Sequence, residues 1–253
     1  MQKILESIEY FGSLDVTPEV LKALQKAFLY SVPFENLDIH ARIPITLDPQ
    51  RFYQKIVQNG RGGFCYECNS VFYQLLRQLG FDAHFIAARM TETDINNQRY
   101  SHMALLVNLD RPYLVDVGNG QSVMVPMTIG DDTISEAEGI QYKVAPFDAV
   151  EYALYFRKQG ADWHPRFVFS TISRRLEEFA QMCLYHQTSP DSLFMKQRLC
   201  TRPTTGGRMT LLGNQFSIME NGNETTVTLE SDHQIDAILQ QYFNMRLPVK
   251  TSG

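Results

Sequence analysis

The segment 61–69, with the sequence RGGFCYECN, constrains the fold most because two glycines lead directly into a helical pattern. After it, apolar side chains recur at the three-to-four spacing of one helix face, at Cys68, Phe72, Leu75, Leu76 and Leu79. Gly80 then supplies a stop signal, since glycine favours the left-handed conformation that ends many helices. The pattern therefore predicts a helix that begins at Cys65 and ends at Gly80.

The position of Cys65 makes it a candidate nucleophile. In the first turn of a helix, unpaired backbone N–H groups and the positive end of the helix dipole favour a thiolate over a thiol. Cys68 differs because it falls on the apolar stripe of the same helix, where a cysteine packs as a small core residue. We therefore assign the reactive thiol to Cys65 and a packing role to Cys68.

Composition excludes several classes of partner. The chain has 253 residues, of which 44% are hydrophobic, so it can bury one large core or two to three subdomains packed together. Its net charge of −5 and its scattered Lys and Arg residues give no footprint for nucleic acid or an anionic membrane. The amino-terminal residues lack a secretory signal pattern, and no run approaches a membrane span. We expect a cytoplasmic protein with reduced cysteines.

The hydrophobic periodicity changes from helical to strand-like after Gly80. Thr17 and Pro18 predict a helix start, and Pro33 ends this helix in a loop at 32–37. Beyond residue 80, strands are expected at 81–87, 100–108, 112–117, 141–145, 151–157 and 165–170, followed by a helix at 173–183. The remainder is expected to form a connection at 187–208, strands at 208–218 and 224–230, and a helix at 233–243.

Two residues of the first predicted hairpin complete a possible catalytic set. A cysteine nucleophile needs a base and a group that orients the base, often His and a carboxylate. His102 and Asp116 share a sheet face only if three residues separate paired positions, as when Asn108 lies opposite Pro112. We expect that register, with Asp116 opposite Ala104 and diagonal to His102.

A metal or redox site is a weaker interpretation of the cysteines. Cys65 and Cys68 have the spacing of a dithiol or of half a zinc site. The possible further ligands, Cys183, His186 and Cys200, lie at irregular intervals, so we expect no metal. Ordinary surface or core roles are expected for the histidines other than His102, namely His40, His84, His164, His186 and His233.

Several motifs resemble those of the arylamine N-acetyltransferases. They occur in order along nearly the whole chain: Val32–Leu37 (VPFENL), the block RGG-x-C-x-E-x-N at 61–69, Ser101-His102-Met103, Leu114–Gly120 (LVDVGNG), Thr188–Phe194 and Thr204–Leu211. The resemblance implies an α+β fold with a catalytic core like that of cysteine proteases. It implies a helical bundle at 1–83, an antiparallel β-barrel at 84–190 and an α/β lid at 191–253.

The resemblance also implies a reaction and its substrates. Cys65 would take an acetyl group from acetyl-coenzyme A as co-substrate, and a small amine (an arylamine, arylhydroxylamine or hydrazine) would then accept it. His102 would exchange protons with the thiol, and Asp116 would orient His102. Backbone N–H groups near the start of the helix could stabilise the oxyanion.

Further site residues follow from the same resemblance. Phe34, Phe64 and Asn119 are expected to bind the acceptor, and Ser101, Gly118 and Gly120 the coenzyme. Asn119 departs from the family, which commonly has Phe between these two glycines, so the preferred size of the amine is open.

Three other functions remain alternatives. An amide synthase that releases polyketides could use the same Cys-His-Asp set, and so could a cysteine hydrolase that uses water as acceptor. A redox or zinc-binding module built on the two close cysteines is the third. The sequence leaves open whether the protein is a monomer or a homodimer.

Overall fold

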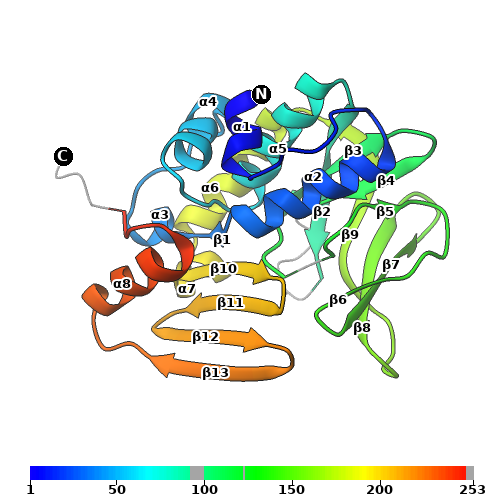
Figure 1. Ribbon diagram of the computed structural model, residues 1–253. Coiled ribbons are helices and arrows are strands. Elements are labelled where there is room, and N and C mark those ends of the chain that lie inside the picture. The colour runs from blue at the N-terminus through cyan, green and yellow to red at the C-terminus, as the bar shows by residue number, and fades with distance from the viewer. Residues whose placement is uncertain (92–99, 122, 249–253) are drawn as a thin grey trace.

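The computed structural model describes residues 1–91, 100–121 and 123–248. Figure 1 shows helices of the amino-terminal part above two separate sheets. The first helices are α1 (Gln2–Ser7), α2 (Pro18–Ser31), α3 (Leu37–His40), α4 (Pro49–Tyr53), a π-helical turn (Gln54–Gln58) and α5 (Cys65–Leu79). In these described ranges, every helix is too short or too polar to cross a membrane.

Helix α5 confirms the prediction made from the glycine turn. It begins at Cys65, and Gly80 ends it in the left-handed conformation with φ of 97°. Most of its side chains are buried, because α5 packs on α4 on one side and on the neighbouring sheet on the other. Cys65 therefore lies at a buried helix end rather than at the surface.

The central sheet has eight antiparallel strands and its own hydrophobic core. Its order is β5-β4-β3-β2-β9-β8-β7-β6, formed by β2 (Asp82–Met90), β3 (His102–Asn108), β4 (Pro112–Val115), β5 (Met127–Thr128), β6 (Ser135–Ala137), β7 (Ile140–Pro146), β8 (Tyr152–Lys158) and β9 (His164–Arg174). β5 also contacts β7, so the sheet curls into a nearly closed barrel. In the β3–β4 hairpin Asn108 pairs with Pro112, which confirms the predicted register.

The second sheet combines distant parts of the chain. Its order is β1-β10-β11-β12-β13, formed by β1 (Phe34–Glu35), β10 (Leu199–Thr204), β11 (Gly207–Leu212), β12 (Gln215–Glu220) and β13 (Asn223–Thr228). Helix α8 (Asp232–Phe243) packs on it and buries a small apolar core (Figure 1). Helices α6 (Ala180–Thr188) and α7 (Leu193–Lys196) lead from the barrel to this sheet. The α+β class is confirmed, whereas the domain boundaries and the role of the last part as a lid stay predictions.

The structure corrects three expectations about the second half. The helix expected at 173–183 begins later, because β9 continues to Arg174 in pairing with β2 and is followed by a 3₁₀ turn. The expected strand at 208–218 is instead a hairpin, since Gly213 with φ of 61° allows a tight turn.

The segment 187–208, expected to be a connection, contains α7 and β10. Pro203 is tolerated in β10 because β1 pairs only with Cys200 and Thr201, so its missing N–H faces an unpaired edge.

Candidate active site

The glycine turn before Cys65 is held by the segment that was predicted to be a loop. The N–H of Gly63 donates to the carbonyl of Pro33 at 3.2 Å, and the N–H of Glu35 donates to the carbonyl of Gly63 at 3.0 Å. A side chain on Gly62 would overlap the Pro33 carbonyl. Glycine is therefore required for this close approach, which fixes where α5 begins.

A buried ionic cluster supports the same turn. Lys55 Nζ lies 2.8 Å from Asp38 and 2.9 Å from Glu67, and Arg61 lies 2.6 Å from Glu35 and 2.9 Å from Asp38. We call these five residues the ionic cluster. Glu67 also accepts the N–H of Phe64 at 3.1 Å, which satisfies one of the free donors at the start of α5.

The ionic cluster contains three carboxylates but only two cations, and this imbalance affects its protonation. Burial raises the pKa of Glu67 to about 7, although Lys55 acts in the opposite direction. Burial also disfavours the charge of Lys55, but the carboxylates of Glu35, Glu67 and Asp38 raise its pKa overall. If the cluster bound one proton near neutral pH, two charged carboxylates would remain to balance its two cations.

His102 and Asp116 form a buried hydrogen-bonded pair. His102 is the first residue of β3 and Asp116 directly follows β4, and the Nε2 of the ring lies 2.8 Å from Oδ2 of the carboxylate. Burial raises the pKa of Asp116, but His102 and further hydrogen bonds bring that pKa below its ordinary value. The ionised carboxylate therefore holds the proton on Nε2 and leaves Nδ1 to exchange a proton with another group.

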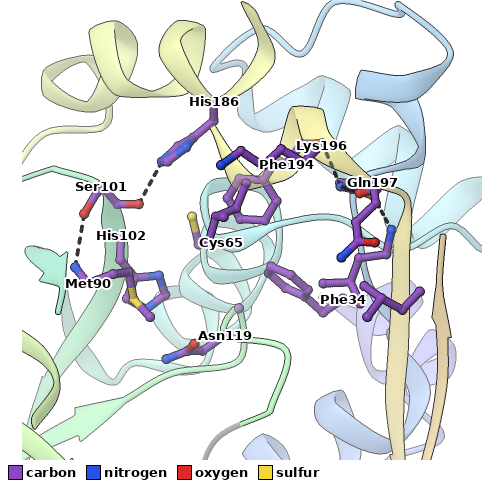
Figure 2. Close-up of a pocket in the computed structure, with 15 residues that line it drawn as sticks. Phe34, Cys65, Met90, Ser101, His102, Asn119, His186, Phe194, Lys196 and Gln197 are labelled. Carbon is purple, nitrogen blue, oxygen red and sulfur yellow. Dashed lines mark hydrogen bonds between the residues drawn. The ribbon is translucent and has the colours of Figure 1, made fainter. Parts of the chain in front are cut away.

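Cys65 and His102 line the same cavity (Figure 2). Burial raises the pKa of the Cys65 thiol, whereas backbone N–H groups of Met103 and Tyr66 lower it and the charge of Asp116 raises it. The helix start alone therefore does not yield the thiolate that the sequence led us to expect. Ionisation of Cys65 requires transfer of its proton to a base, and the ring of His102 lines the same cavity.

Asn69 ends the motif at 61–69 but was assigned no role at the site from the sequence. It lies one turn after Cys65, and its amide nitrogen donates to the carbonyl of Met103 at 2.7 Å and to Asp116 Oδ1 at 3.0 Å. Its oxygen accepts the N–H of Val117 at 3.1 Å. Asn69 thus joins α5 to the strands that carry His102 and Asp116. A polar side chain in a mostly apolar helix was the signal that could have found it.

Gly118 allows the loop after Asp116 to lie against the start of α5. Its N–H donates to Asp116 Oδ1 at 2.9 Å, and a Cβ atom on Gly118 would lie 2.7 Å from the Cα of Cys65. Any larger residue would push this loop away from the thiol.

Four of the other residues predicted to bind ligands line the cavity, which has a volume of about 330 Å³: Phe34, Ser101, Gly118 and Asn119. Two do not. Phe64 is fully buried, with its ring 5.8 Å from that of Phe194, so it supports the cavity from behind. Gly120 lies against the ring of Phe34 rather than at the cavity surface.

The structure adds lining residues that we had not assigned to the site: Asn36, Met90, His186, Leu193, Phe194, Lys196, Gln197, Leu199 and Leu212. His186 had been given an ordinary role, yet its Nε2 lies 2.9 Å from the carbonyl oxygen of Ser101, next to His102. Burial lowers the pKa of His186 to about 4, so the ring is neutral at pH 7 and Nε2 donates this hydrogen bond.

In the part of the chain that the structure describes, no group of His, Cys, Asp or Glu side chains could hold a metal ion, and all four cysteines are free thiols. A cysteine at a helix start, a histidine and a carboxylate around an apolar cavity are the arrangement of cysteine-dependent acyl-transfer and hydrolytic enzymes.

Comparisons with known proteins identify the family within that class. A family model described as N-acetyltransferase matches residues 17–252. The pineal gland isozyme NAT-10 of arylamine N-acetyltransferase from Gallus gallus is 32% identical, over 95% of this chain and 92% of the relative. The arylamine N-acetyltransferase of Escherichia coli is 27% identical, over 94% and 86%. The chain belongs to the arylamine N-acetyltransferase family.

Solved structures of the family have the same fold. The arylamine N-acetyltransferase of Mycobacterium marinum, solved in complex with CoA, superposes with a TM-score of 0.86 at 26% identity, covering 96% of this chain and 92% of the other. The enzyme of Salmonella typhimurium gives a TM-score of 0.90 at 24% identity, covering 100% and 93%. Because its identity is only 24%, the Salmonella typhimurium enzyme supports the fold alone.

Proposed function

We propose that this protein transfers an acetyl group from acetyl-coenzyme A to an arylamine, arylhydroxylamine or hydrazine through a thioester on Cys65. One observation carries the proposal. The hydrogen-bonded pair of His102 and Asp116 lies at the cavity that contains Cys65, and the cavity walls are mainly apolar. Such a cavity suits an aromatic amine, and the hydrogen-bonded pair suits proton transfer to and from sulfur.

The first half-reaction forms the acyl-enzyme. His102 accepts the thiol proton at Nδ1, and the thiolate of Cys65 attacks the acetyl carbonyl of the thioester. The bond from the carbonyl carbon to the coenzyme A sulfur breaks, and the departing thiolate takes a proton from the imidazolium. Asp116 stabilises the imidazolium while it exists, because its carboxylate stays ionised.

The second half-reaction returns the enzyme to its starting state. The amine nitrogen attacks the acetyl-Cys65 carbonyl, and Nδ1 of His102 removes the proton that the nitrogen loses. The bond from the carbonyl carbon to Cys65 sulfur then breaks, and the sulfur recovers a proton from the ring. No metal or redox step is needed, since only one acyl group and one proton change partners.

The comparisons support acetyl-coenzyme A as the donor. The relatives from Gallus gallus and Escherichia coli bear the name arylamine N-acetyltransferase, and the Mycobacterium marinum enzyme was solved in complex with CoA. A Bacillus cereus relative is described with a Cys-His-Glu triad, whereas the carboxylate in this chain is Asp116. The four free cysteines agree with our proposal of a cytoplasmic location.

Mass spectrometry of the intact protein tests this function. After brief exposure to acetyl-coenzyme A, the wild-type protein should gain one acetyl group, located at Cys65 by peptide mapping. Cys68→Ser should gain the same group, because the Cys68 sulfur is buried and donates to the Gly63 carbonyl at 3.1 Å. Cys65→Ser should gain no thioester. Acetylation at any position other than 65 that survives in Cys65→Ser would contradict the proposal.

The same assay separates the alternatives. For the transferase, an aromatic amine should remove the acetyl group from Cys65 and appear as its amide. Equal loss of the acetyl group with and without amine would instead indicate a hydrolase. Acylation only by long-chain thioesters would indicate an amide synthase.

A further inference from the structure

The cavity that contains Cys65 has one strongly basic side chain in its wall. Among the described residues that line it, Lys196 is the only Lys, Arg, Asp or Glu. His186 is neutral at pH 7 because burial lowers its pKa to about 4. The other walls are largely apolar, and the rings of Phe34 and Phe194 form an adjacent aromatic pair with centroids 6.1 Å apart.

Lys196 is the last residue of α7, and its side chain extends along the edge of the cavity beside Phe194 (Figure 2). Within the described ranges, no side chain forms an ion pair or hydrogen bond with its ammonium group. Lys196 also borders a neighbouring groove that contains Glu230 and Asp232, but Asp232 pairs with Arg198 at 2.6 Å rather than with Lys196. The charge of Lys196 is therefore available to a ligand in the cavity.

An unpaired cation beside apolar walls favours a ligand of a particular chemistry. Lys196 is exposed, so water screens part of its charge, but the apolar walls exclude water from the cavity side, where a ligand would lie. An aromatic ring can contact Phe34 and Phe194, while an anionic group on the ring can approach the ammonium of Lys196.

We propose that Lys196 is a specificity-determining residue that favours acceptor amines carrying a negatively charged ring substituent, such as a carboxylate or sulfonate. This inference rests on the proposed function, because it assumes that the acceptor binds beside Cys65. The amine nitrogen would face the thioester, and the charged substituent would lie at the α7 side of the cavity.

The phosphates of coenzyme A are another source of negative charge, but we assign Lys196 to the acceptor. Lys196 lines the cavity that holds the reacting sulfur, whereas the long pantetheine arm separates the thioester from the phosphates of the coenzyme. The two assignments differ in which half-reaction Lys196 affects, so kinetics can distinguish them.

The test compares 4-aminobenzoate with 4-methylaniline, a neutral amine of similar shape. In Lys196→Met, kcat/KM for 4-aminobenzoate should fall about fivefold, the loss of one partly screened ion pair, while the value for 4-methylaniline should hardly change. Lys196→Glu should reduce kcat/KM for 4-aminobenzoate further. High salt should also reduce the preference of the wild-type enzyme for 4-aminobenzoate over 4-methylaniline, because salt screens the charge of Lys196.

Two controls make the result specific. Lys158→Met removes the same charge from an exposed position at the end of β8 and should leave the ratio of the two kcat/KM values unchanged. Release of coenzyme A in a single turnover without amine should be equal in the wild type and Lys196→Met. Slower release in Lys196→Met would assign the charge to the donor phosphates, and equal losses with both amines would assign it a structural role; either result overturns the proposal.

A binding measurement separates this inference from the proposed function. Calorimetric titration with 4-aminobenzoate should show about fivefold weaker binding to Lys196→Met than to the wild type. If the wild type never acquires an acetyl group but this difference remains, the proposed function fails, and what stands is that Lys196 binds the anionic group of an aromatic ligand. If acetylation proceeds and the affinities are equal, the role of Lys196 fails alone.

Discussion

The two sides of the cavity differ in how firmly they are held. One side, which we call the catalytic wall, consists of the start of α5, the start of β3 and the loop after β4. It is buried, and the ionic cluster together with Asn69 holds it in place. The other side, the recognition wall, consists of α7 and the neighbouring ends of β10 and β11, where Leu193, Lys196 and Leu212 are exposed to solvent.

This difference follows from what each wall has to do. The proton transfer that we propose between Cys65 and His102 requires fixed distances, and buried hydrogen bonds hold the segments that carry these residues. Recognition of different amines needs only a suitable surface, and exposed side chains can change without disturbing a core. We therefore expect substitutions in the catalytic wall to have large effects on chemistry or stability, and substitutions at the recognition wall to have smaller effects on substrate choice.

The largest expected effect is that of Asp116→Asn in the catalytic wall. An amide at this position no longer stabilises the imidazolium, and it can hold the ring in the wrong tautomer, so kcat/KM should fall about 10³- to 10⁴-fold. Alkylation of Cys65 by iodoacetamide at neutral pH should slow as well, while the circular dichroism spectrum stays unchanged. Undiminished alkylation would argue against a triad.

Lys55→Met tests the support of the catalytic wall. It leaves three buried carboxylates facing Arg61 alone, and breaking a buried ion pair by removing one partner costs about 3–5 kcal/mol of unfolding free energy. Urea denaturation at pH 7 measures this loss. Lys158→Met, at an exposed position, is the matched control. Equal stability of the two variants would show that the ionic cluster does not stabilise the catalytic wall.

His186 lies where the two walls meet and predicts a pH dependence of stability. Its folded-state pKa of about 4 is below the ordinary value of 6.5, so between these values the unfolded chain binds the proton more readily. The unfolding free energy should therefore fall as the pH falls from 6.5 towards 4, by up to about 3 kcal/mol.

His186→Asn should remove most of that fall, as measured by urea denaturation at pH 7 and pH 4.5. His233→Asn, at an exposed position in α8, should retain it. A fall of the same size in His186→Asn would show that other groups bind the protons.

Arg208→Lys is expected to have a smaller effect than these three changes, because it alters the loop that the recognition wall faces. Arg208 pairs with Glu138 at 2.8 Å and donates to the carbonyl of Gly120 at 2.9 Å, which ties β11 to the loop carrying Asn119. Lysine keeps the charge but loses the fork-shaped contact. We expect kcat/KM for amines to fall about tenfold, mainly through KM, with Cys65 acylation unchanged.

A matched control for this change is Arg77→Lys, at an exposed ion pair with Asp82. It should leave both half-reactions unaltered. A large loss of Cys65 acylation in Arg208→Lys would mean that this contact supports the catalytic wall instead.

The catalytic wall was more predictable from sequence than the recognition wall. The start of α5 could be predicted from two glycines and an apolar stripe, and the register of His102 and Asp116 from the parity of one hairpin. These are local patterns, in which each residue is interpreted with neighbours a few positions away. Lys196 and His186 carried no comparable pattern, because their relation to Cys65 arises only when α6 and α7 fold back on α5.

The sequence by itself determined which segments form helices and strands around Cys65, since helix stop signals and alternating polarity act over short distances. Only the tertiary structure decided the chemistry of the site. Burial raised the pKa of the Cys65 thiol, and packing of distant segments placed Asn69 on Asp116 and Lys196 at the cavity edge. Solvent exclusion and long-range contacts depend on the whole fold, so no local pattern could have shown them.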